Sequence, residues 1–413
     1  MITVKEALAQ VLATVKPLPL EKVGLLDTLG RVLGEGIRSG RDIPPKNNSA
    51  MDGYALRAVD TRGASIERPA TLRVIEDVPA GYLWTKKIGA GEAVRIMTGA
   101  PIPEGADAVV KVEDTENEGG DVRVFVSAVE GLNIRLAGGD VRVGELVIRK
   151  GSVVRPAEAG MLAALGRSIV YVHQVPVVAI ISTGDELADI DEPLSPAKIT
   201  NSNGYALAAQ VLECGAVPLQ VGIARDDRRE LAEKFRMALR ADAILSSGGV
   251  SVGDYDLVKE VMMALGTRMK FWRIAMRPGR PLAFGTLKGK PLFGLPGNPV
   301  SSMVSFEQFV RPALRKMLGH RDLFRRAVRA TLTESITKEK GLRYFVRGRV
   351  VYENGLYSVT TAGGQGSGIL KSMVKANGLI VLPEDLTEAK KGETVSVQLI
   401  DRSLENAVSP EYL

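Results

Sequence analysis

Between residues 175 and 319, short apolar runs alternate with helical patterns, and this alternation constrains the fold more than any other feature of the chain. Asn201 stands where it can cap a helix that ends near Glu213, and the strand patterns 217–223 and 242–246 lie further on. Repeated strand–helix units predict a mostly parallel, doubly wound sheet with right-handed crossovers. Because such sheets bind ligands beyond the carboxyl ends of their strands, the loops at that edge are the first place to expect a site.

Two glycine-rich loops stand at that predicted edge. Residues 246–256 follow the apolar run 243–245, and residues 294–302 follow the run 291–293. Both segments have the pattern of a buried strand, a loop and a helix. Since glycine has no Cβ, several backbone N–H groups of such a loop can converge on an oxyanion, and the dipole of the following helix adds to the attraction. We interpret the pair as a phosphate or similar oxyanion site with a hard metal ion; two ordinary turns are the alternative.

Charged side chains are concentrated in the neighbouring loops. Arg277 and Arg280 flank a proline–glycine pair and offer planar guanidinium groups that suit tetrahedral oxyanions. Asp254 and Asp256 end the first glycine loop, and hard carboxylates beside phosphate indicate Mg²⁺. Each pattern has a structural alternative, namely exposed arginines in a turn and acids favoured by a helix N-terminus.

The flanking regions have a different character. Thr3 and Glu6 form the pattern of a capping box before an N-terminal helix, whereas residues 44–140 and the last ninety residues contain short alternating runs punctuated by glycine and proline. At 413 residues the chain is too long for one core. We therefore predict an α/β multidomain chain with small β domains on either side of the sheet. The predicted domains are a β-rich domain 44–140, an α/β domain 174–320 and a β-barrel-like domain 321–413, with residues 1–43 and 141–173 outside them.

The charge of the chain is local. Its net charge is +6, and residues 321–349 carry nine Lys or Arg against three acids, which accounts for the whole excess. Such a strip suggests an anionic partner, with a solvated face as the alternative. The strip lacks interleaved aromatic residues, which disfavours single-stranded nucleic acid.

Cysteine and apolar content exclude some classes of protein. Cys214 is the only cysteine, so no internal disulfide forms, and this fits a reducing cytoplasm. The two histidines are far apart in the sequence, which disfavours a histidine-rich zinc or iron site. No apolar run approaches the ~20 residues that a membrane-spanning helix needs.

Taken together, these stretches resemble the molybdopterin molybdenumtransferase family, also called the MoeA family, which is related to the E domain of gephyrin. The resemblance covers nearly the whole chain. The segments that carry it are residues 48–55, 97–110, 182–187, 246–256, 278–281, 294–301, 345–348 and 364–367.

The resemblance implies a transferase of molybdenum cofactor biosynthesis that inserts molybdate into adenylylated molybdopterin and releases AMP. It implies an elongated subunit, a central domain like that of molybdopterin adenylyltransferase, and a cytoplasmic homodimer whose active site is shared between subunits. Mg²⁺ is the implied metal, and molybdopterin adenylyltransferase is the expected upstream partner. Neither nucleic acid nor a membrane is expected as a partner.

The residues implied for the site fall into three groups. The catalytic residues are Asp52, Thr98, Asp140, Glu186, Asp226 and Asp256. The residues that bind cofactor and substrate are Ser247, Gly248, Gly249, Ser251, Gly253, Arg277, Arg280, Gly297, Asn298, Ser301, Arg347 and Ser367. The metal ligands are Asp254, Asp256 and Glu186.

One departure from the family pattern concerns the anion. The family usually has lysine where this chain has Arg277 and Arg280. Arginine keeps the charge but changes the reach and the donor geometry, and unlike lysine it does not give up a proton. The choice between molybdate and tungstate therefore stays open. Two further alternatives are an adenylyltransferase acting on molybdopterin, which the additional domains argue against, and a non-catalytic scaffold, which the retained acids argue against.

Overall fold

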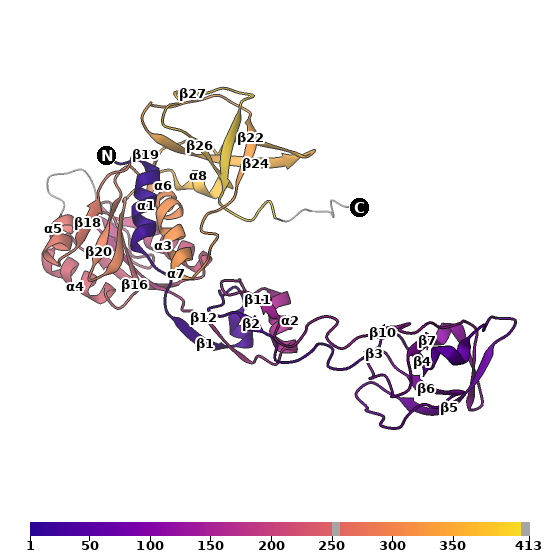
Figure 1. Cartoon of the computed structure of the whole chain (residues 1–413). Coiled ribbons are helices and arrows are strands. Elements are labelled where there is room, and N and C mark those ends of the chain that lie inside the picture. The colour runs from indigo at the N-terminus through magenta and orange to yellow at the C-terminus, as the bar shows by residue number, and fades with distance from the viewer. Residues whose placement is uncertain (250–256, 406–413) are drawn as a thin grey trace. The chain divides into compact units, whose positions relative to one another are not determined.

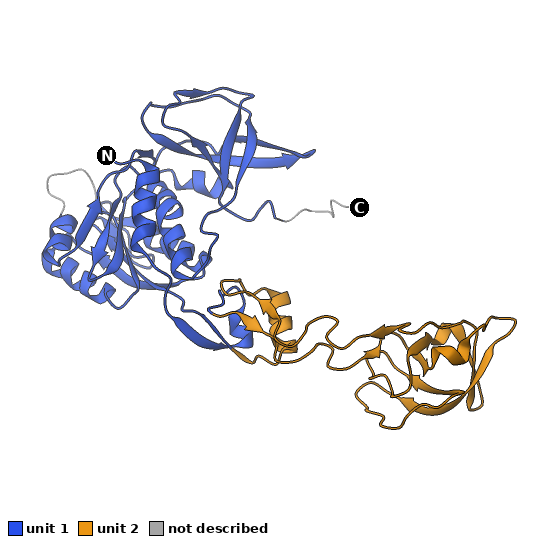
Figure 2. Ribbon diagram, viewed as in Figure 1, with its two compact units in different colours: residues 1–34, 170–413 blue, residues 35–169 orange. Residues whose placement is uncertain are grey.

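The computed structural model describes residues 1–249 and 257–405. The chain divides into two compact units, one made of residues 1–34 and 170–413 and the other of residues 35–169 (Figure 2). Within the described residues, no helix is both long enough and apolar enough to cross a membrane.

The centre of the first unit is a six-stranded sheet (Figure 1). In the order in which they pair, its strands are β16 (Val217–Ala224), β13 (Val177–Thr183), β17 (Ala243–Ser247), β21 (Lys290–Leu295), β20 (Ala283–Leu287) and β18 (Arg268–Phe271). The first four strands are parallel, as the alternating pattern predicts. The last two pairings, β21 with β20 and β20 with β18, are antiparallel. Lys288 and Gly289, both with positive φ, close the two-residue hairpin between β20 and β21.

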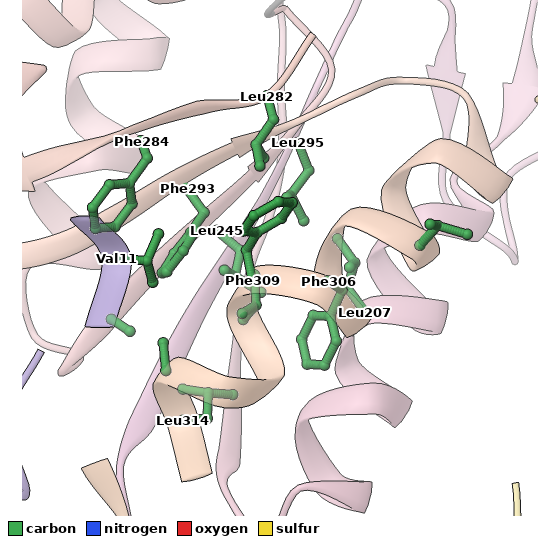
Figure 3. Close-up of a cluster of buried hydrophobic side chains, with 14 of the residues drawn as sticks. Val11, Leu207, Leu245, Leu282, Phe284, Phe293, Leu295, Phe306, Phe309 and Leu314 are labelled. Carbon is green, nitrogen blue, oxygen red and sulfur yellow. The ribbon is translucent and has the colours of Figure 1, made fainter. Parts of the chain in front are cut away.

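Helices cover both faces of this sheet. One face packs against α1 (Val4–Thr14), α3 (Ser202–Glu213), α6 (Pro299–Ser305), the π-helical segment η4 (Phe306–Val310) and α7 (Arg311–Met317). Figure 3 shows the core there, where Phe293 and Leu245 of the sheet lie among Phe306, Phe309 and Val11. The other face packs against α4 (Arg228–Ala238) and α5 (Leu257–Ala264). This burial on both faces explains why β13 reads as a continuous apolar run.

Local capping sets where the helices begin. The Asn201 side chain accepts a hydrogen bond from the Gly204 N–H and caps α3, as predicted. Thr3 and Glu6 form the predicted capping box of α1. Asp227 caps α4 by accepting from the Arg229 and Glu230 N–H groups.

The C-terminal part of the first unit is a second six-stranded sheet. Its strands, in pairing order, are β19 (Met276–Arg277), β24 (Arg343–Glu353), β25 (Leu356–Thr361), β22 (Ala327–Leu332), β28 (Thr394–Leu399) and β26 (Gly378–Leu382). An additional pairing of β24 with β26 closes the last five strands into a small barrel with its own core. Helix α8 (Leu370–Lys375) lies in the connection between β25 and β26.

Strand β19 joins the two sheets of this unit. It follows β18 in the chain, yet it pairs with β24 of the barrel, so that Arg277 lies opposite Tyr344. The remaining short ladders of the unit are β1 (Leu20–Gly24) with β12 (Ile169–His173), β14 (Leu187–Ala188) with β15 (Ile199–Thr200), and β23 (Ile336–Thr337) with β27 (Glu388–Ala389).

The second unit is rich in strands, as predicted for residues 44–140. Its main sheet has the order β7 (Ala108–Lys111), β4 (Gly53–Leu56), β6 (Glu92–Ile96), β5 (Ala70–Val78), β9 (Asp121–Val124) and β8 (Thr115–Glu118). Two short ladders, one α-helix and two 3-10 helices complete it: β3 (Asn48–Ser49) with β10 (Ile134–Arg135), β2 (Ile37–Arg38) with β11 (Leu146–Ile148), α2 (Pro156–Ala164), η2 (Ala58–Thr61) and η3 (Val112–Asp114).

Candidate active site

A cleft of about 640 Å³ opens at the carboxyl ends of the four parallel strands, and we call it the glycine cleft. Each of the four loops that follow these strands contributes to it, as the sequence pattern predicts. Its lining consists of Thr183, Gly184, Glu186, Leu187, Ile199, Thr200, Asn201, Ser202, Asn203, Asp226, Ser247, Gly248, Gly249, Pro281, Pro296, Gly297, Asn298, Pro299 and Gly368.

Backbone groups build the floor of the glycine cleft. Gly248 and Gly249 have φ values of +94° and +62°, and a Cβ on Gly248 would lie 2.5 Å from the Thr183 carbonyl oxygen. Only glycine fits this conformation and this close approach. The Gly248 N–H donates to the Leu295 carbonyl at 3.1 Å, so the first glycine loop is tied to the end of β21.

Asn203 joins the two glycine loops. Its Nδ2 donates to Ser247 Oγ at 2.8 Å and to the Gly297 carbonyl at 2.7 Å. Because a carbonyl can only accept, the amide nitrogen must face Gly297. The sequence analysis missed this residue; the only signal for it is its place in the first turn of the helix that Asn201 caps.

Acidic side chains line one side of the glycine cleft. Glu186 and Asp226 contribute to the lining, and the Asp226 N–H donates to Asp185 Oδ1 at 3.1 Å. Burial, followed by repulsion from Asp185 and Glu186, raises the pKa of Asp226. Arg225 donates to the Leu187 carbonyl at 2.7 Å, and Lys198 donates to the Asp185 carbonyl, so cations hold the loop that carries these acids.

A second cleft of about 530 Å³ lies beside β19, and we call it the arginine cleft. It is lined by Arg277, Pro278, Thr337, Lys338, Glu339, Tyr344, Phe345, Val346, Arg347, Gln365 and Gly366. The segment 363–368 contributes to both clefts, with Gln365 and Gly366 in this one and Gly368 in the glycine cleft.

Arg277 is already engaged in the arginine cleft. Its Nη1 donates to Glu339 Oε1 at 2.9 Å and to the Tyr344 hydroxyl at 3.3 Å, and its guanidinium lies 5.7 Å from the centre of the Tyr344 ring. Arg280 is exposed, and within the described part of the chain its side chain has no hydrogen-bond or ionic partner.

Arg347 is a buried cation. Its side chain is 1% exposed, and it donates to Ser372 Oγ and to the Gly366 carbonyl, both at 3.1 Å, and to the Gly364 carbonyl at 3.4 Å. Among the residues that the structure describes, no carboxylate pairs with it. Burial lowers the pKa of Arg347 to about 10, so the guanidinium is still charged at neutral pH. It holds the segment 363–368 from one side, while the Ser367 carbonyl accepts from the Val300 N–H of α6 on the other.

Two of the predicted residues, Asp52 and Thr98, are hydrogen-bonded to each other in the second unit. Asp52 Oδ1 accepts from the Thr98 N–H at 2.6 Å and from the Thr98 hydroxyl at 2.7 Å. These hydrogen bonds lower the pKa of Asp52, so its carboxylate is ionised at neutral pH. Asp140 is exposed in the same unit, and its N–H donates to the Ile43 carbonyl at 3.0 Å.

Comparison with known proteins shows relatives along the whole chain. The MoeA N-terminal region (domain I and II) matches residues 2–166, a probable molybdopterin binding domain matches 179–316, and the MoeA C-terminal region (domain IV) matches 329–400. Molybdopterin molybdenumtransferase 2 of Mycobacterium tuberculosis is 41% identical, and the match covers 91% of this chain and 94% of that protein. Molybdopterin molybdenumtransferase of Staphylococcus aureus is 36% identical, with coverage of 97% and 96%. The chain belongs to the molybdopterin molybdenumtransferase family.

Solved structures agree with this assignment. The molybdopterin biosynthesis MoeA protein of Pyrococcus horikoshii superposes with a TM-score of 0.84 at 34% identity, over 97% of this chain and 99% of that one. The family resemblance and the fold class predicted from the sequence are therefore confirmed. The family is one of transferases in molybdenum cofactor biosynthesis.

Within this family fold, the structure separates residues that the sequence grouped at one rim. Ser247, Gly248, Gly249, Gly297, Asn298, Glu186 and Asp226 do lie together in the glycine cleft. The loop 277–281 is divided between the two clefts: Pro281 lines the glycine cleft, whereas Arg277 lines the arginine cleft. The reason is the pairing of β19 with β24, which carries Arg277 to the barrel. Ser301 is 4% exposed in the first turn of α6.

Four of the predicted residues lie outside the described part of the chain, namely Ser251, Gly253, Asp254 and Asp256. Within the described residues, no group of three or more acidic, histidine or cysteine side chains could hold a metal ion.

The basic strip 321–349 does not form one open cationic face. Arg325 pairs with Glu307 at 2.7 Å and with Glu213 at 2.8 Å, and Arg343 pairs with Glu384 at 2.9 Å. These acids lie outside the strip and neutralise much of its charge locally. The net charge of the strip therefore does not by itself identify a binding surface.

Proposed function

We propose that this chain inserts molybdate into adenylylated molybdopterin and releases AMP. The observation that carries the proposal is the pair of clefts that the segment 363–368 joins. One cleft is built of backbone groups around glycine loops, and the other holds arginine side chains. A pterin phosphate ester and a tetrahedral oxoanion need these two kinds of surface, side by side.

The glycine cleft is the place for the adenylylated pterin. A Cβ on Gly297 would meet only the Gly248 Cα, at 3.7 Å, so Gly297 leaves room for a phosphate to approach the backbone, and Asn203 joins the two loops. Ser247 and Asn298 add polar groups to the lining. Preorganised donors of this kind stabilise a developing phosphate charge without having to reorganise.

The arginine cleft is the place for the oxoanion. Arg277 presents a guanidinium there, and Arg280 follows on the same loop. Arg347 acts through the segment it holds, which brings Ser367 towards α6 and Ser301. Cations placed in advance supply the electrostatic stabilisation that a doubly charged oxoanion requires.

We propose Mg²⁺ as the metal of the glycine cleft. Glu186, which lines the cleft, would hold it together with Asp254 and Asp256, which lie outside the described residues, and carboxylate oxygens are the hard ligands that this ion prefers. When bound, the ion neutralises charge on the phosphate that leaves with AMP. Asp226, whose pKa is raised, is the acid that we assign to proton transfer in this cleft. The hydrogen bonds from Thr98 lower the pKa of Asp52 and make its carboxylate a weaker base, so we assign Asp52 to positioning the substrate.

We further propose a cytoplasmic homodimer with a shared site, in which Asp52, Thr98 and Asp140 of one subunit serve the clefts of the other. Four domains, at residues 1–43 with 141–173, 44–140, 174–320 and 321–413, would make up each subunit. The substrate would come from a molybdopterin adenylyltransferase. Mixing Asp52→Ala and Asp256→Ala subunits tests the sharing, because one of the two sites in a mixed dimer would be intact and the other would carry both substitutions. Freely exchanging subunits that regain no activity would exclude it.

The direct experiment is to incubate the purified chain with adenylylated molybdopterin, Mg²⁺ and either molybdate or tungstate, and to measure AMP. We expect AMP release that depends on the oxoanion. Release with tungstate alone would make the chain a tungsten transferase. ATP consumption with pterin and no oxoanion would make it an adenylyltransferase, and a complete lack of turnover would favour a scaffold.

A further inference from the structure

The arginine cleft contains an acid that the proposed reaction does not use. Glu339 Oε1 accepts from Arg277 Nη1 at 2.9 Å, and the Glu339 N–H donates to the Tyr344 hydroxyl at 3.2 Å. The Glu339 side chain is 67% exposed and that of Arg277 is 58% exposed, so solvent anions can reach both. The cation that we assign to the oxoanion is therefore already paired with a carboxylate of its own chain.

The position of this acid is built into the fold. Its neighbour Lys338 is 9% exposed and donates to the Pro383 carbonyl at 2.8 Å and to the Leu386 carbonyl at 2.6 Å, which fixes the backbone next to Glu339. Both Lys338 and Arg277 make cation–π contacts with the Tyr344 ring, at 5.2 Å and 5.7 Å from its centre. The backbone at Glu339 is thus anchored on both sides, and its carboxylate pairs with Arg277.

We propose that Glu339 determines anion specificity by occupying Arg277 until the oxoanion substrate displaces it. The inference rests on the proposed function, because it requires Arg277 to contact the oxoanion. A carboxylate tethered this close has a high effective concentration, so dilute monoanions such as chloride compete poorly for the guanidinium. A doubly charged tetrahedral oxoanion that reaches more than one cation can replace it. The exchange breaks one ion pair and forms another, with no covalent step.

The expected size of the effect follows from the exposure of the pair. Removing an exposed ion pair changes a binding constant by only a few-fold. The displaced Glu339 carboxylate also repels the bound oxoanion, and this repulsion is twice as large for a dianion as for a monoanion. Removing the Glu339 charge should therefore tighten molybdate binding by about 3- to 30-fold at low ionic strength. Chloride should then also compete with molybdate for Arg277, whereas gluconate at the same ionic strength should not.

Isothermal titration of the full chain with sodium molybdate tests this. The variants are Glu339→Gln, Glu339→Asp, Arg277→Ala and the double variant Arg277→Ala with Glu339→Gln. The matched control is Glu384→Gln, which also removes one negative charge from an Arg–Glu pair of the barrel, since Glu384 pairs with Arg343 at 2.9 Å outside the cleft. We expect tighter, chloride-sensitive binding for Glu339→Gln, near-native binding for Glu339→Asp, and less than a twofold change for the control.

The other outcomes separate this inference from the proposed function. If Arg277→Ala weakens molybdate binding while Glu339→Gln binds like the control or more weakly, Glu339 does not compete for the arginine and only the inference fails. If Arg277→Ala binds molybdate like the unmodified chain, the assignment of Arg277 to the oxoanion fails, and the inference fails with it. A gain from Glu339→Gln that persists in the double variant also overturns the inference, because it cannot act through Arg277.

Discussion

The two clefts of the first unit differ in what builds them. In the glycine cleft, the floor is backbone that Gly248 and Gly249 hold at positive φ, and burial together with the neighbouring acids raises the pKa of Asp226. In the arginine cleft, the charged groups are side chains, and Arg277 is paired within the chain by Glu339. The glycine cleft thus holds acids that repel one another, whereas the arginine cleft pairs one of its cations, Arg277, with an acid of its own lining.

This difference predicts how each cleft responds to change. A backbone site has no alternative conformation to relax into, so a small change of shape has a large effect on the reaction. A site made of paired side chains can exchange one partner for another, so single changes there have smaller and more selective effects. Four predictions follow this order from the largest effect to the smallest.

Gly248→Ala should nearly abolish the reaction. The new Cβ would lie 2.5 Å from the Thr183 carbonyl oxygen, at a φ of +94°, so the loop must shift. A shift of about 1 Å in such a site costs on the order of 100-fold in rate, and AMP release should fall at least that far. The control is Gly289→Ala, which has a φ of +83° and open space around its Cβ. It should lose about 1–3 kcal/mol of stability through strain and keep its activity. Equal activity of the two variants would show that the reaction does not depend on the backbone conformation at Gly248.

The contrast also explains what could be predicted from the sequence. Asn201, the glycine loops and the acids at 186 and 226 belong to local patterns, in which a strand, a loop and a helix start follow one another within about fifteen residues. Arg277 and Glu339 are 62 residues apart, and the short strand β19 that brings them together has only two residues. Nothing in the local sequence of a two-residue strand specifies its distant partner. The bond from Asn203 to Gly297, across 94 residues, was missed for the same reason.

Arg347→Ala should cost mainly stability. The change removes a 1%-exposed side chain and leaves the Gly364 and Gly366 carbonyls and Ser372 without their donor. We expect the free energy of unfolding to fall by about 2–4 kcal/mol in urea titrations. Arg343→Ala, which removes a partly exposed pair with Glu384, should cost under about 1 kcal/mol. Loss of molybdate binding in Arg347→Ala with unchanged stability would instead make Arg347 a direct ligand of the oxoanion.

Asn203→Asp should weaken the glycine cleft without touching the arginine cleft. The substitution puts an oxygen where Nδ2 donates to the Gly297 carbonyl at 2.7 Å, so two acceptors would face each other. We expect kcat/KM for the adenylylated pterin to fall by about 10- to 100-fold, because an unpaired polar contact of this kind costs about 1–3 kcal/mol. Molybdate affinity should stay the same. Gln210→Ala removes an amide from the same helix outside both clefts and should leave turnover unchanged. If molybdate binding also weakens in Asn203→Asp, the two clefts are not independent.

Asp226→Asn should have the smallest effect, which is a gain in stability at pH 7 that we expect in the glycine cleft and not in the arginine cleft. Burial and the nearby Asp185 and Glu186 raise the pKa of Asp226 above its unfolded value, so the folded chain binds this proton more readily than the unfolded chain does. The stability that the group contributes is then present at low pH and is lost as the pH rises through the folded pKa. The amide mimics the protonated form, so the variant should be more stable than the unmodified chain at pH 7, by less than about 1 kcal/mol because the side chain is exposed. The gain should vanish below about pH 4, where the carboxyl is protonated in both states. Urea titrations at the two pH values measure this gain.

The control is Glu339→Gln, which separates an ion pair in the arginine cleft and should show no such gain at pH 7. A gain of equal size in both variants would remove the electrostatic distinction between the clefts.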